Sequence, residues 1–250
     1  MKIKFISKHA EYLVHPVPMK KVVPRWYKDM EKYINKDLNL GTVKNCVPVL
    51  DSVTMGYALL SSIDIMFTKT INDNQTVDVK VQSGRLNEFE HLDMLKNIPQ
   101  EINYHVSAHS SYEFAKKMVY KNEIPIAFKF GNPWIIKTPP GYSCLFTSPF
   151  NTEERDIRIV TGVVDTDRYE TYVNFPFFLK DWDEKLSPQK IIPKGYPIAL
   201  VFPFARNDWH MKVSNDTDKN HKMRSKWLFN FATYMVDMYK NNAWVRKNYK

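Results

Sequence analysis

The residues best suited to chemistry lie in one short acidic segment. The strand-like run Gly-Val-Val at 162–164 leads directly into Asp165, and Asp167 and Glu170 follow. A strand of this kind delivers carboxylates to one loop, and a few carboxylates combined with phosphate oxygens are typical ligands of Mg²⁺. Asp165 and Asp167 are therefore candidates for a metal-assisted site. The alternative is a solvated acidic loop that forms turns.

A second candidate site is the pair His105 and His109, in the sequence His-Val-Ser-Ala-His. Both imidazoles fall on one face of a helix or a strand, so they could begin a zinc or iron site with Glu90, His91 or Glu113 as third ligand. A metal there would indicate a cupin-like enzyme. Histidines that bind no metal are the alternative.

Two aromatic segments, at 174–179 and 201–209, could supply a surface on which bases stack. Arg206 and Trp209 stand at the end of the second segment, where exposure is expected. Core packing is the alternative for both segments, because aromatic runs in strands usually fill the interior.

Length and composition describe a globular chain. It has 250 residues, of which 44 % are hydrophobic and 25 % are charged, and this suits one domain with a sizeable core. The longest apolar runs, such as Pro197–Phe204, are far shorter than the roughly 20 residues that span a bilayer. No signal peptide is evident at Met1–Ile6. Cys46 and Cys144 form no disulfide framework, so a cytoplasmic setting is expected, with Cys144 as a buried free thiol rather than a nucleophile.

The net charge of +9 is carried by the two ends of the chain. Residues 1–36 carry +6 and residues 219–250 carry +7, whereas residues 37–218 carry −4. An anionic partner, if there is one, is therefore expected at an end. The basic candidates near the C-terminus are Lys222, Arg224, Lys226, Arg246 and Lys247.

The pattern of elements predicts a mainly β protein, a sandwich, jelly roll or distorted barrel, with helical additions at both ends. Most of the expected strands are rich in β-branched or aromatic residues and are bounded by Pro, Gly, Asn or Asp. They are Asn45–Leu50, Tyr57–Phe67, Val77–Gln82, Pro125–Phe130, Trp134–Lys137, Ser143–Phe146, Ile157–Val164, Tyr172–Phe178 and Ile198–Phe204. A short helix is expected at Ser111–Lys121. One domain results, with a basic N-terminal extension (1–41), a β body (42–212) and a basic C-terminal amphipathic helix (213–250).

Helical periodicity is clearest at the two ends. Pro24 stands in a favoured first-turn position, and Trp26 and Ile34 share one face of the helix expected after it. Near the C-terminus, Trp227 and Phe231 begin a wide apolar face. We expect this face to pack on the β body, and its basic back either faces solvent or contacts nucleic acid or an acidic protein surface.

Residues 134–204 contain turns and strand ends in a distinctive order: a Pro-Pro-Gly turn ending at Gly141, Ser148, Asp165, and then Gly195 before an apolar strand. The separations are 7, 17 and 30 residues. With Gly56-Tyr-Ala-Leu upstream, this order resembles the dUTPase and dCTP deaminase superfamily over residues 45–204. The resemblance implies a dUTPase-like distorted β-barrel or jelly roll, usually trimeric. The whole chain is also similar to a protein family of T4-like marine bacteriophages, which implies a setting in the host cytoplasm or the virion.

The resemblance implies Asp165 as the catalytic carboxylate and a set of nucleotide-binding candidates. These are Ser148, Asp167, Arg168 and Tyr169. Several family residues are missing: Ala58 replaces an Asp, Leu200 replaces a Gln, and no glycine follows Gly195 to close over phosphates. The deaminase variant also needs a Glu that the strand after the Asp165 loop lacks.

These departures favour a non-catalytic binding or structural protein, phage-encoded and built on a dUTPase-like fold, with no cofactor. The alternative is a Mg²⁺-dependent hydrolase of dUTP or dCTP type with an altered site around Asp165. A cupin-like metal enzyme that uses His105 and His109 is the third hypothesis.

Overall fold

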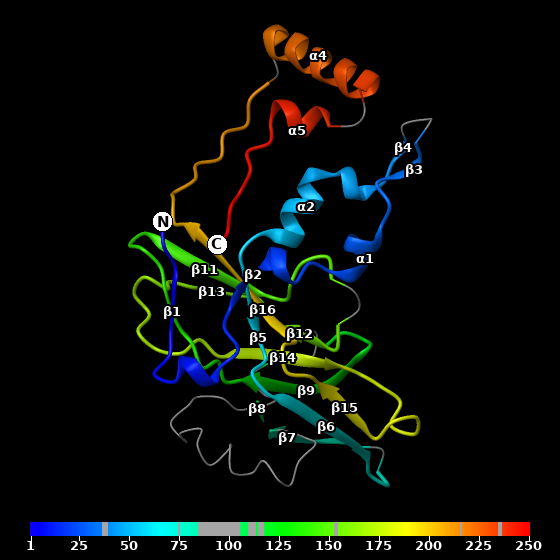
Figure 1. The fold of residues 1–250 in the computed structure, drawn as a ribbon, viewed down its shortest axis with the longest axis vertical. Coiled ribbons are helices and arrows are strands. Elements are labelled where there is room, and N and C mark those ends of the chain that lie inside the picture. The colour runs from blue at the N-terminus through cyan, green and yellow to red at the C-terminus, as the bar shows by residue number, and fades with distance from the viewer. Residues whose placement is uncertain are drawn as a thin grey trace.

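The computed structural model describes residues 1–36, 40–74, 76–84, 106–109, 114, 118–152, 155–215, 217–234 and 237–250. Within these ranges the chain is mainly β, as its sequence predicts, and every strand pairing is antiparallel. The described strands form separate sheets and do not close into one barrel (Figure 1).

Three sheets make up the body. The five-stranded sheet has the order β13 (Gly162–Val164), β11 (Tyr142–Thr147), β16 (Pro197–Ala205), β5 (Tyr57–Leu60), β2 (Val17–Pro18). The four-stranded sheet has the order β12 (Ile157–Ile159), β14 (Phe175–Lys180), β9 (Glu123–Phe130), β8 (Val106–Ala108). The three-stranded sheet has the order β15 (Gln189–Ile192), β6 (Asp64–Ile71), β7 (Val77–Gly84).

Two small sheets complete the set: β1 (Lys4–Ile6) pairs with β10 (Ile135–Lys137), and β3 (Tyr33–Asn35) pairs with β4 (Leu40–Gly41). Short 3-10 turns occur at Ala10–Tyr12, Met19–Lys21 and Val43–Asn45. The N-terminal segment therefore contributes strands to the body, because β1 and β2 pair with β10 and β5.

The core lies where the sheets meet and is built from aromatic rings. Phe67 of β6 packs edge-on against Phe128 of β9 at 5.5 Å between ring centroids, and Phe128 stacks on Phe177 of β14 at 5.6 Å. Phe146 of β11 contacts Phe175 of β14 at 5.4 Å, which joins the five-stranded and four-stranded sheets. Core packing is thus the role of the aromatic segment at 174–179.

The helix expected after Pro24 is shorter than its periodicity predicts. Helix α1 spans only Arg25–Asp29, and the chain then turns into β3. The Lys44 ammonium donates hydrogen bonds to the carbonyl oxygens of Lys28 and Met30, at 2.6 and 2.8 Å. These contacts satisfy carbonyls that a longer helix would have used, so a tertiary contact ends the helix early.

The strand expected at Asn45–Leu50 is also wrong, because helix α2 spans Val47–Thr54. Pro48 lies in its first turn, where a missing backbone N–H costs nothing. The buried Val47 and Val53 lie on its inner side. Short apolar runs do not distinguish strand from buried helix. Most of the helix expected at Ser111–Lys121 lies outside the described residues.

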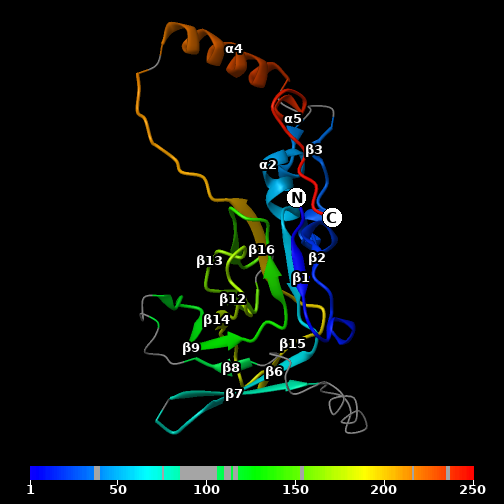
Figure 2. The same cartoon turned by 90° about the vertical axis from the view of Figure 1, so that its left-hand side faces the viewer.

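The C-terminal helices stand apart from the sheets. After β16 the chain runs as an extended arm to α4 (Asp218–Tyr234), which packs with α5 (Met238–Asn242), and the last residues return to the body (Figures 1 and 2). The expectation that this helix packs on the β body is therefore wrong: the extended arm holds α4 away from it. Within the described ranges, no helix is both long enough and apolar enough to cross a membrane.

Candidate functional site

Asp165 follows β13 directly, and its side chain is 55 % exposed. Its Oδ1 atom accepts a hydrogen bond of 2.6 Å from the Ser143 hydroxyl. The same oxygen lies 3.3 Å from a guanidinium nitrogen of Arg206. One oxygen of the carboxylate is therefore held by groups of the same chain, and the other remains for solvent or a ligand.

Asp167 is the buried carboxylate of this loop, and its hydrogen bonds stabilise the loop. Its side chain is only 6 % exposed and accepts hydrogen bonds from both terminal nitrogens of Arg206, at 2.8 and 2.5 Å. It also accepts a hydrogen bond of 2.8 Å from the backbone N–H of Gly141. The Arg206 guanidinium holds the pKa of Asp167 well below its usual range. Asp167 thus ties the Pro-Pro-Gly turn to the end of β16, which gives it a structural role.

This pairing predicts a pH-dependent contribution to stability. Because the pKa of Asp167 is lowered in the folded state, the ionised carboxylate stabilises the fold above the unfolded value of about 3.9. That contribution fades as the pH falls from about 4 towards the folded pKa. We therefore expect the free energy of unfolding of Asp167→Asn, measured in urea, to lie below wild type at pH 6 and to approach it below about pH 4.

Asp73 provides the matched control, because it is exposed in the turn between β6 and β7. Asp73→Asn should stay close to wild type throughout the titration. A gap between Asp167→Asn and wild type that keeps the same size from pH 6 to acid would contradict the role given to the ionised carboxylate.

The other residues of this loop lie on the surface. Arg168 is exposed, and the Tyr169 side chain is also exposed, with its hydroxyl donating a hydrogen bond to the Tyr172 carbonyl at 3.4 Å. Glu170 pairs with Lys137 at 2.5 Å. The structure thus brings Asp165, Asp167, Arg168 and Tyr169 onto one loop.

Ser148 lies apart from the loop that carries Asp165. Ser143, at the start of β11, contacts Asp165, whereas Ser148 follows the end of the same strand. Five residues of extended chain span roughly 16 Å. Within one chain, the candidate nucleotide-binding residues therefore occupy two separate places, and Ser148 lines a cavity.

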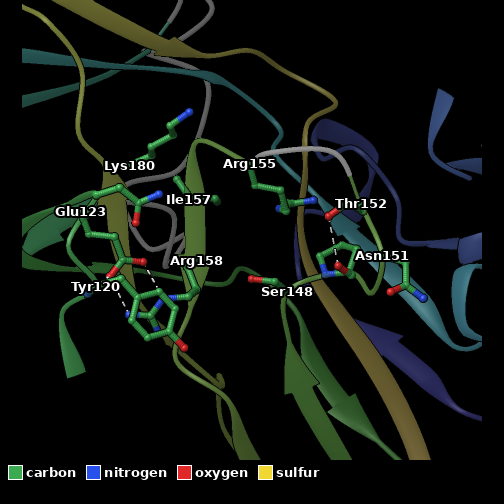
Figure 3. A pocket seen from close by; sticks show the side chains of 11 residues that line it. Tyr120, Glu123, Ser148, Asn151, Thr152, Arg155, Ile157, Arg158 and Lys180 are labelled. Carbon is green, nitrogen blue, oxygen red and sulfur yellow. Dashed lines mark hydrogen bonds and ion pairs between the residues drawn. The ribbon is translucent and has the colours of Figure 1, made fainter. Parts of the chain in front are cut away.

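The cavity beside Ser148 has a volume of about 290 Å³ and lies where the turn after β11, strand β12 and the ends of β9 and β14 meet. Figure 3 shows Ser148 between Arg158 with Tyr120 on one side and Thr152 on the other. The Ser148 Oγ atom accepts a hydrogen bond of 2.9 Å from the backbone N–H of Ile159. That bond fixes the oxygen and leaves the hydroxyl proton to point at a ligand.

Arg158 forms an ion pair with Glu123 at one wall of the cavity. It donates to both carboxylate oxygens of Glu123, at 2.5 and 2.7 Å, and stacks over the Tyr120 ring at 3.9 Å from the centroid. The Glu123 carboxylate raises the pKa of Arg158. Because the side chain of Glu123 is only 6 % exposed, this ion pair is largely shielded from water.

Arg155 is held differently. One terminal nitrogen donates to the carbonyl oxygen of Pro197, and the guanidinium lies 4.8 Å from the centroid of the Tyr196 ring. Within the described part of the chain, its buried Nε atom has no hydrogen-bond partner and its charge has no ion pair within 4 Å. Burial lowers the pKa of this arginine. Its charge also interacts with that of Asp156, which itself pairs with Lys190 at 3.1 Å. A largely buried cation without a carboxylate at ion-pair distance is costly for a fold and typical of a binding group.

The N-terminal helices hold the rim of the cavity. Asn151 adopts a left-handed backbone (φ 49°), which asparagine tolerates better than most residues. Its carbonyl accepts a hydrogen bond of 2.8 Å from the Trp26 indole of α1, and its amide donates one of 2.7 Å to Ser52 of α2. The two helices therefore fix the turn that carries Ser148.

The histidine pair is only partly described. His109 follows β8, its backbone N–H donates to the Ala127 carbonyl at 2.8 Å, and its ring packs on Phe114. His105 and its partners Glu90, His91 and Glu113 lie outside the described residues. Among the residues that are described, no three His, Cys, Asp or Glu side chains are grouped to hold a metal ion.

The expectation of a buried free thiol at Cys144 is confirmed, and Cys46 is an exposed free thiol. Burial raises the pKa of Cys144 to about 11, and the Thr166 hydroxyl lies 3.3 Å from its sulfur. A thiol with this pKa is a poor nucleophile at neutral pH.

Arg206 and Trp209, the candidates for a base-stacking surface, lie in different environments. Arg206 is bound to Asp167, whereas Trp209 is 88 % exposed on the arm after β16. Arg155 was not among the predicted site residues. It stands in the polar run Asn-Thr-Glu-Glu-Arg-Asp, which has the composition of any surface turn.

Comparison of the chain with family models, with curated proteins and with solved structures found no match.

Proposed function

We propose that this protein is a non-catalytic binding protein that holds a phosphate-bearing ligand in the cavity beside Ser148. The observation that carries the proposal is Arg155, whose Nε atom is buried without a hydrogen-bond partner and whose guanidinium has no carboxylate within ion-pair distance among the described residues. A phosphate group in the cavity would supply the negative charge that this guanidinium lacks at ion-pair distance.

The rest of the cavity suits the same ligand. Among the described residues, its titratable wall includes Arg155, Arg158 and Lys180 against one carboxylate, that of Glu123, so this part of the wall is basic. Figure 3 shows Lys180 pointing away from Ser148, which leaves the serine hydroxyl and Arg155 as the groups closest to a ligand. A volume of 290 Å³ is at the low end of ligand sites, which run from about 300 to 1,000 Å³. We therefore expect a phosphate group with a small appendage.

The Mg²⁺-dependent hydrolase of dUTP or dCTP type is the alternative. It is favoured by the 55 % exposure of Asp165 at the end of a strand. It is disfavoured by the ion pair and hydrogen bond that engage one oxygen of that carboxylate, and by the separation of Ser148 from Asp165 along β11.

A dUTPase-like jelly roll and a phage setting belong to the same proposal. The support for the fold is that β11, β13 and β16, which carry the motif-like residues, are neighbours in one sheet. Gly141 and Gly195 both have positive φ in the turns that precede β11 and β16, as the Pro-Pro-Gly and Pro-Lys-Gly segments predict.

Calorimetric titration with inorganic phosphate and with a panel of phosphorylated nucleosides tests the proposal. A hydrogen bond to a charged group contributes about 1.5–3 kcal/mol, so Arg155→Met should weaken binding roughly 10- to 100-fold. Ser148→Ala should weaken it less, by about five-fold, which corresponds to one neutral hydrogen bond.

Arg25→Met is the matched control, because Arg25 is 86 % exposed and, among the residues that the structure describes, pairs with Asp29 of its own helix. Its affinity should equal that of wild type. Failure of every anion to bind, or an unchanged affinity in Arg155→Met, would refute the proposal. Release of pyrophosphate or ammonia from a nucleotide with Mg²⁺, lost in Asp165→Asn, would establish the hydrolase instead.

A further inference from the structure

Helix α4 is held away from the sheets by a segment that is tied to the body at both ends. At the start of the arm, the backbone N–H of Arg206 donates to the Gly141 carbonyl at 2.8 Å. After α5, the Trp244 indole and the Lys247 ammonium both donate to the Asp51 carboxylate of α2, at 3.0 and 2.6 Å. Figure 2 shows α4 clear of the sheets between these two anchors. The helix therefore has faces that the body does not cover.

One face of α4 combines two lysines with an aromatic ring. Lys222, Lys226 and Phe229 follow one another at intervals of four and three residues, so they share one face of the helix. All three side chains are exposed, Phe229 by 69 %. Trp227 is only partly exposed and lies roughly 100° or more around the helix from each of them. The basic face thus points away from the more covered side of α4.

The two ammonium groups of this face are available to a partner. Within the described part of the chain, no carboxylate lies within 4 Å of Lys222 or Lys226. Two other basic candidates are placed differently: Arg224 lies about 200° around the helix from Lys222, and Lys247 is in an ion pair on the body. The structure therefore selects two of the basic residues near the C-terminus as one surface.

The distribution of charge predicts that the partner is a polyanion. Residues 219–250 carry +7, and residues 1–218 carry +2. A second copy of the chain therefore offers no net negative charge to this face. A separate molecule with many negative charges is complementary to it.

The apolar side chains of α4 disfavour a membrane of acidic lipids. A helix that lies in a membrane surface gathers its apolar residues on one face. The exposed residues Met223, Leu228 and Phe229 are instead separated by about 140° and 100° around α4. They point to three sides, so a bilayer could not bury them together.

The Phe229 ring distinguishes between the remaining polyanions. Proteins that bind single-stranded nucleic acid combine basic groups that contact phosphates with aromatic rings on which bases stack. An acidic protein surface is disfavoured, because lysine is depleted in protein interfaces. We infer that the face of α4 formed by Lys222, Lys226 and Phe229 binds single-stranded nucleic acid.

Fluorescence anisotropy of a labelled oligothymidylate, titrated with the whole chain at several salt concentrations, tests this inference. Each phosphate contact with a single strand contributes about 0.7 to the slope of log K against log salt. Lys222→Gln/Lys226→Gln should therefore weaken binding and reduce the magnitude of this slope by about 1.4. Phe229→Leu, which keeps an apolar side chain with good helix propensity, should weaken binding about five-fold or more and leave the slope unchanged.

Lys80→Gln/Lys185→Gln is the matched control, because it removes the same charge from two exposed lysines. They lie in β7 and in the connection between β14 and β15, and Figure 1 shows β7 and β15 at the end of the molecule opposite α4. This variant should bind the oligonucleotide like wild type. Arg155→Met should do so too, because the cavity beside Ser148 is not part of the α4 face.

Four results would overturn the inference. One is a wild type that does not bind the oligonucleotide at low salt. Another is binding to polyglutamate or to vesicles of anionic lipid that is as tight as binding to the oligonucleotide. The third is an equal loss of affinity and slope in Lys80→Gln/Lys185→Gln and in Lys222→Gln/Lys226→Gln, and the fourth is an unchanged affinity in Phe229→Leu.

Discussion

Gly56→Ala is expected to lower the free energy of unfolding by about 2–4 kcal/mol, because two costs combine at this position. The backbone of Gly56 has φ +76°, and an L-residue pays about 1–2 kcal/mol for the left-handed conformation. A Cβ there would also lie 2.5 Å from the Val201 carbonyl oxygen and 2.9 Å from Leu200 Cδ1. Both atoms belong to β16 in the centre of the largest sheet, where neither has room to move.

Gly195→Ala separates the two costs. Gly195 has φ +84°, but its Cβ would meet no described atom within 4 Å. It should therefore lose only the backbone part, about 1 kcal/mol. Urea unfolding of both variants measures the difference. Equal losses would contradict the close approach of Gly56 to β16, and with it the packing of the loop before β5.

The sequence predicts the β body well because its strands are long enough to show β-rich composition between clear turn residues. Strands β9, β11 and β16 lie where Pro125–Phe130, Ser143–Phe146 and Ile198–Phe204 were expected. Two expected strands are wrong in extent: Tyr57–Phe67 divides into β5 and β6, and Ile157–Val164 divides into β12 and β13, in each case strands of different sheets. The other failures are short segments. The conformations of α1 and α2 are decided by a tertiary contact and by one proline. The hydrophobic periodicity of the sequence does not indicate either of them.

The position of α4 shows a second limit of prediction from the sequence. An amphipathic pattern predicts that an apolar face will be covered, but it does not say by what. A helix was expected over 213–250, and the structure has α4 at Asp218–Tyr234 and the short α5 at Met238–Asn242, so the prediction is correct only in part. The position of α4 is set by the extended arm and by the anchoring of Trp244 and Lys247 to Asp51, which are contacts between residues almost 200 positions apart.

Only part of the candidate site could be predicted from the sequence, again because tertiary contacts decide the rest. Ser148 is marked by its spacing from Gly141, whereas Arg155 has no pattern around it. What distinguishes Arg155 is burial without a carboxylate partner among the described residues. Burial and pairing are tertiary properties, so the residue that carries the proposed function is visible only in the structure.

Arg155→Met is expected to stabilise the protein while it removes ligand binding. In the absence of ligand, the guanidinium is buried, its pKa is lowered by burial, and its Nε atom has no hydrogen-bond partner in the described chain. Methionine keeps an unbranched stem that can pack on the Tyr196 ring and carries no charge to desolvate. We expect the free energy of unfolding to rise by about 1–2 kcal/mol. Thermal and urea unfolding without phosphate measure it.

Arg158→Met is the matched comparison, because the same change in the same cavity should have the opposite sign. It leaves the Glu123 carboxylate, only 6 % exposed, without its cation, and we expect a loss of about 2–3 kcal/mol. Phosphate should narrow the gap between wild type and Arg155→Met, since a ligand stabilises only the form that binds it. If Arg155→Met were destabilised as strongly as Arg158→Met, Arg155 would be a structural cation, and the cavity would lose the group that makes it a binding site.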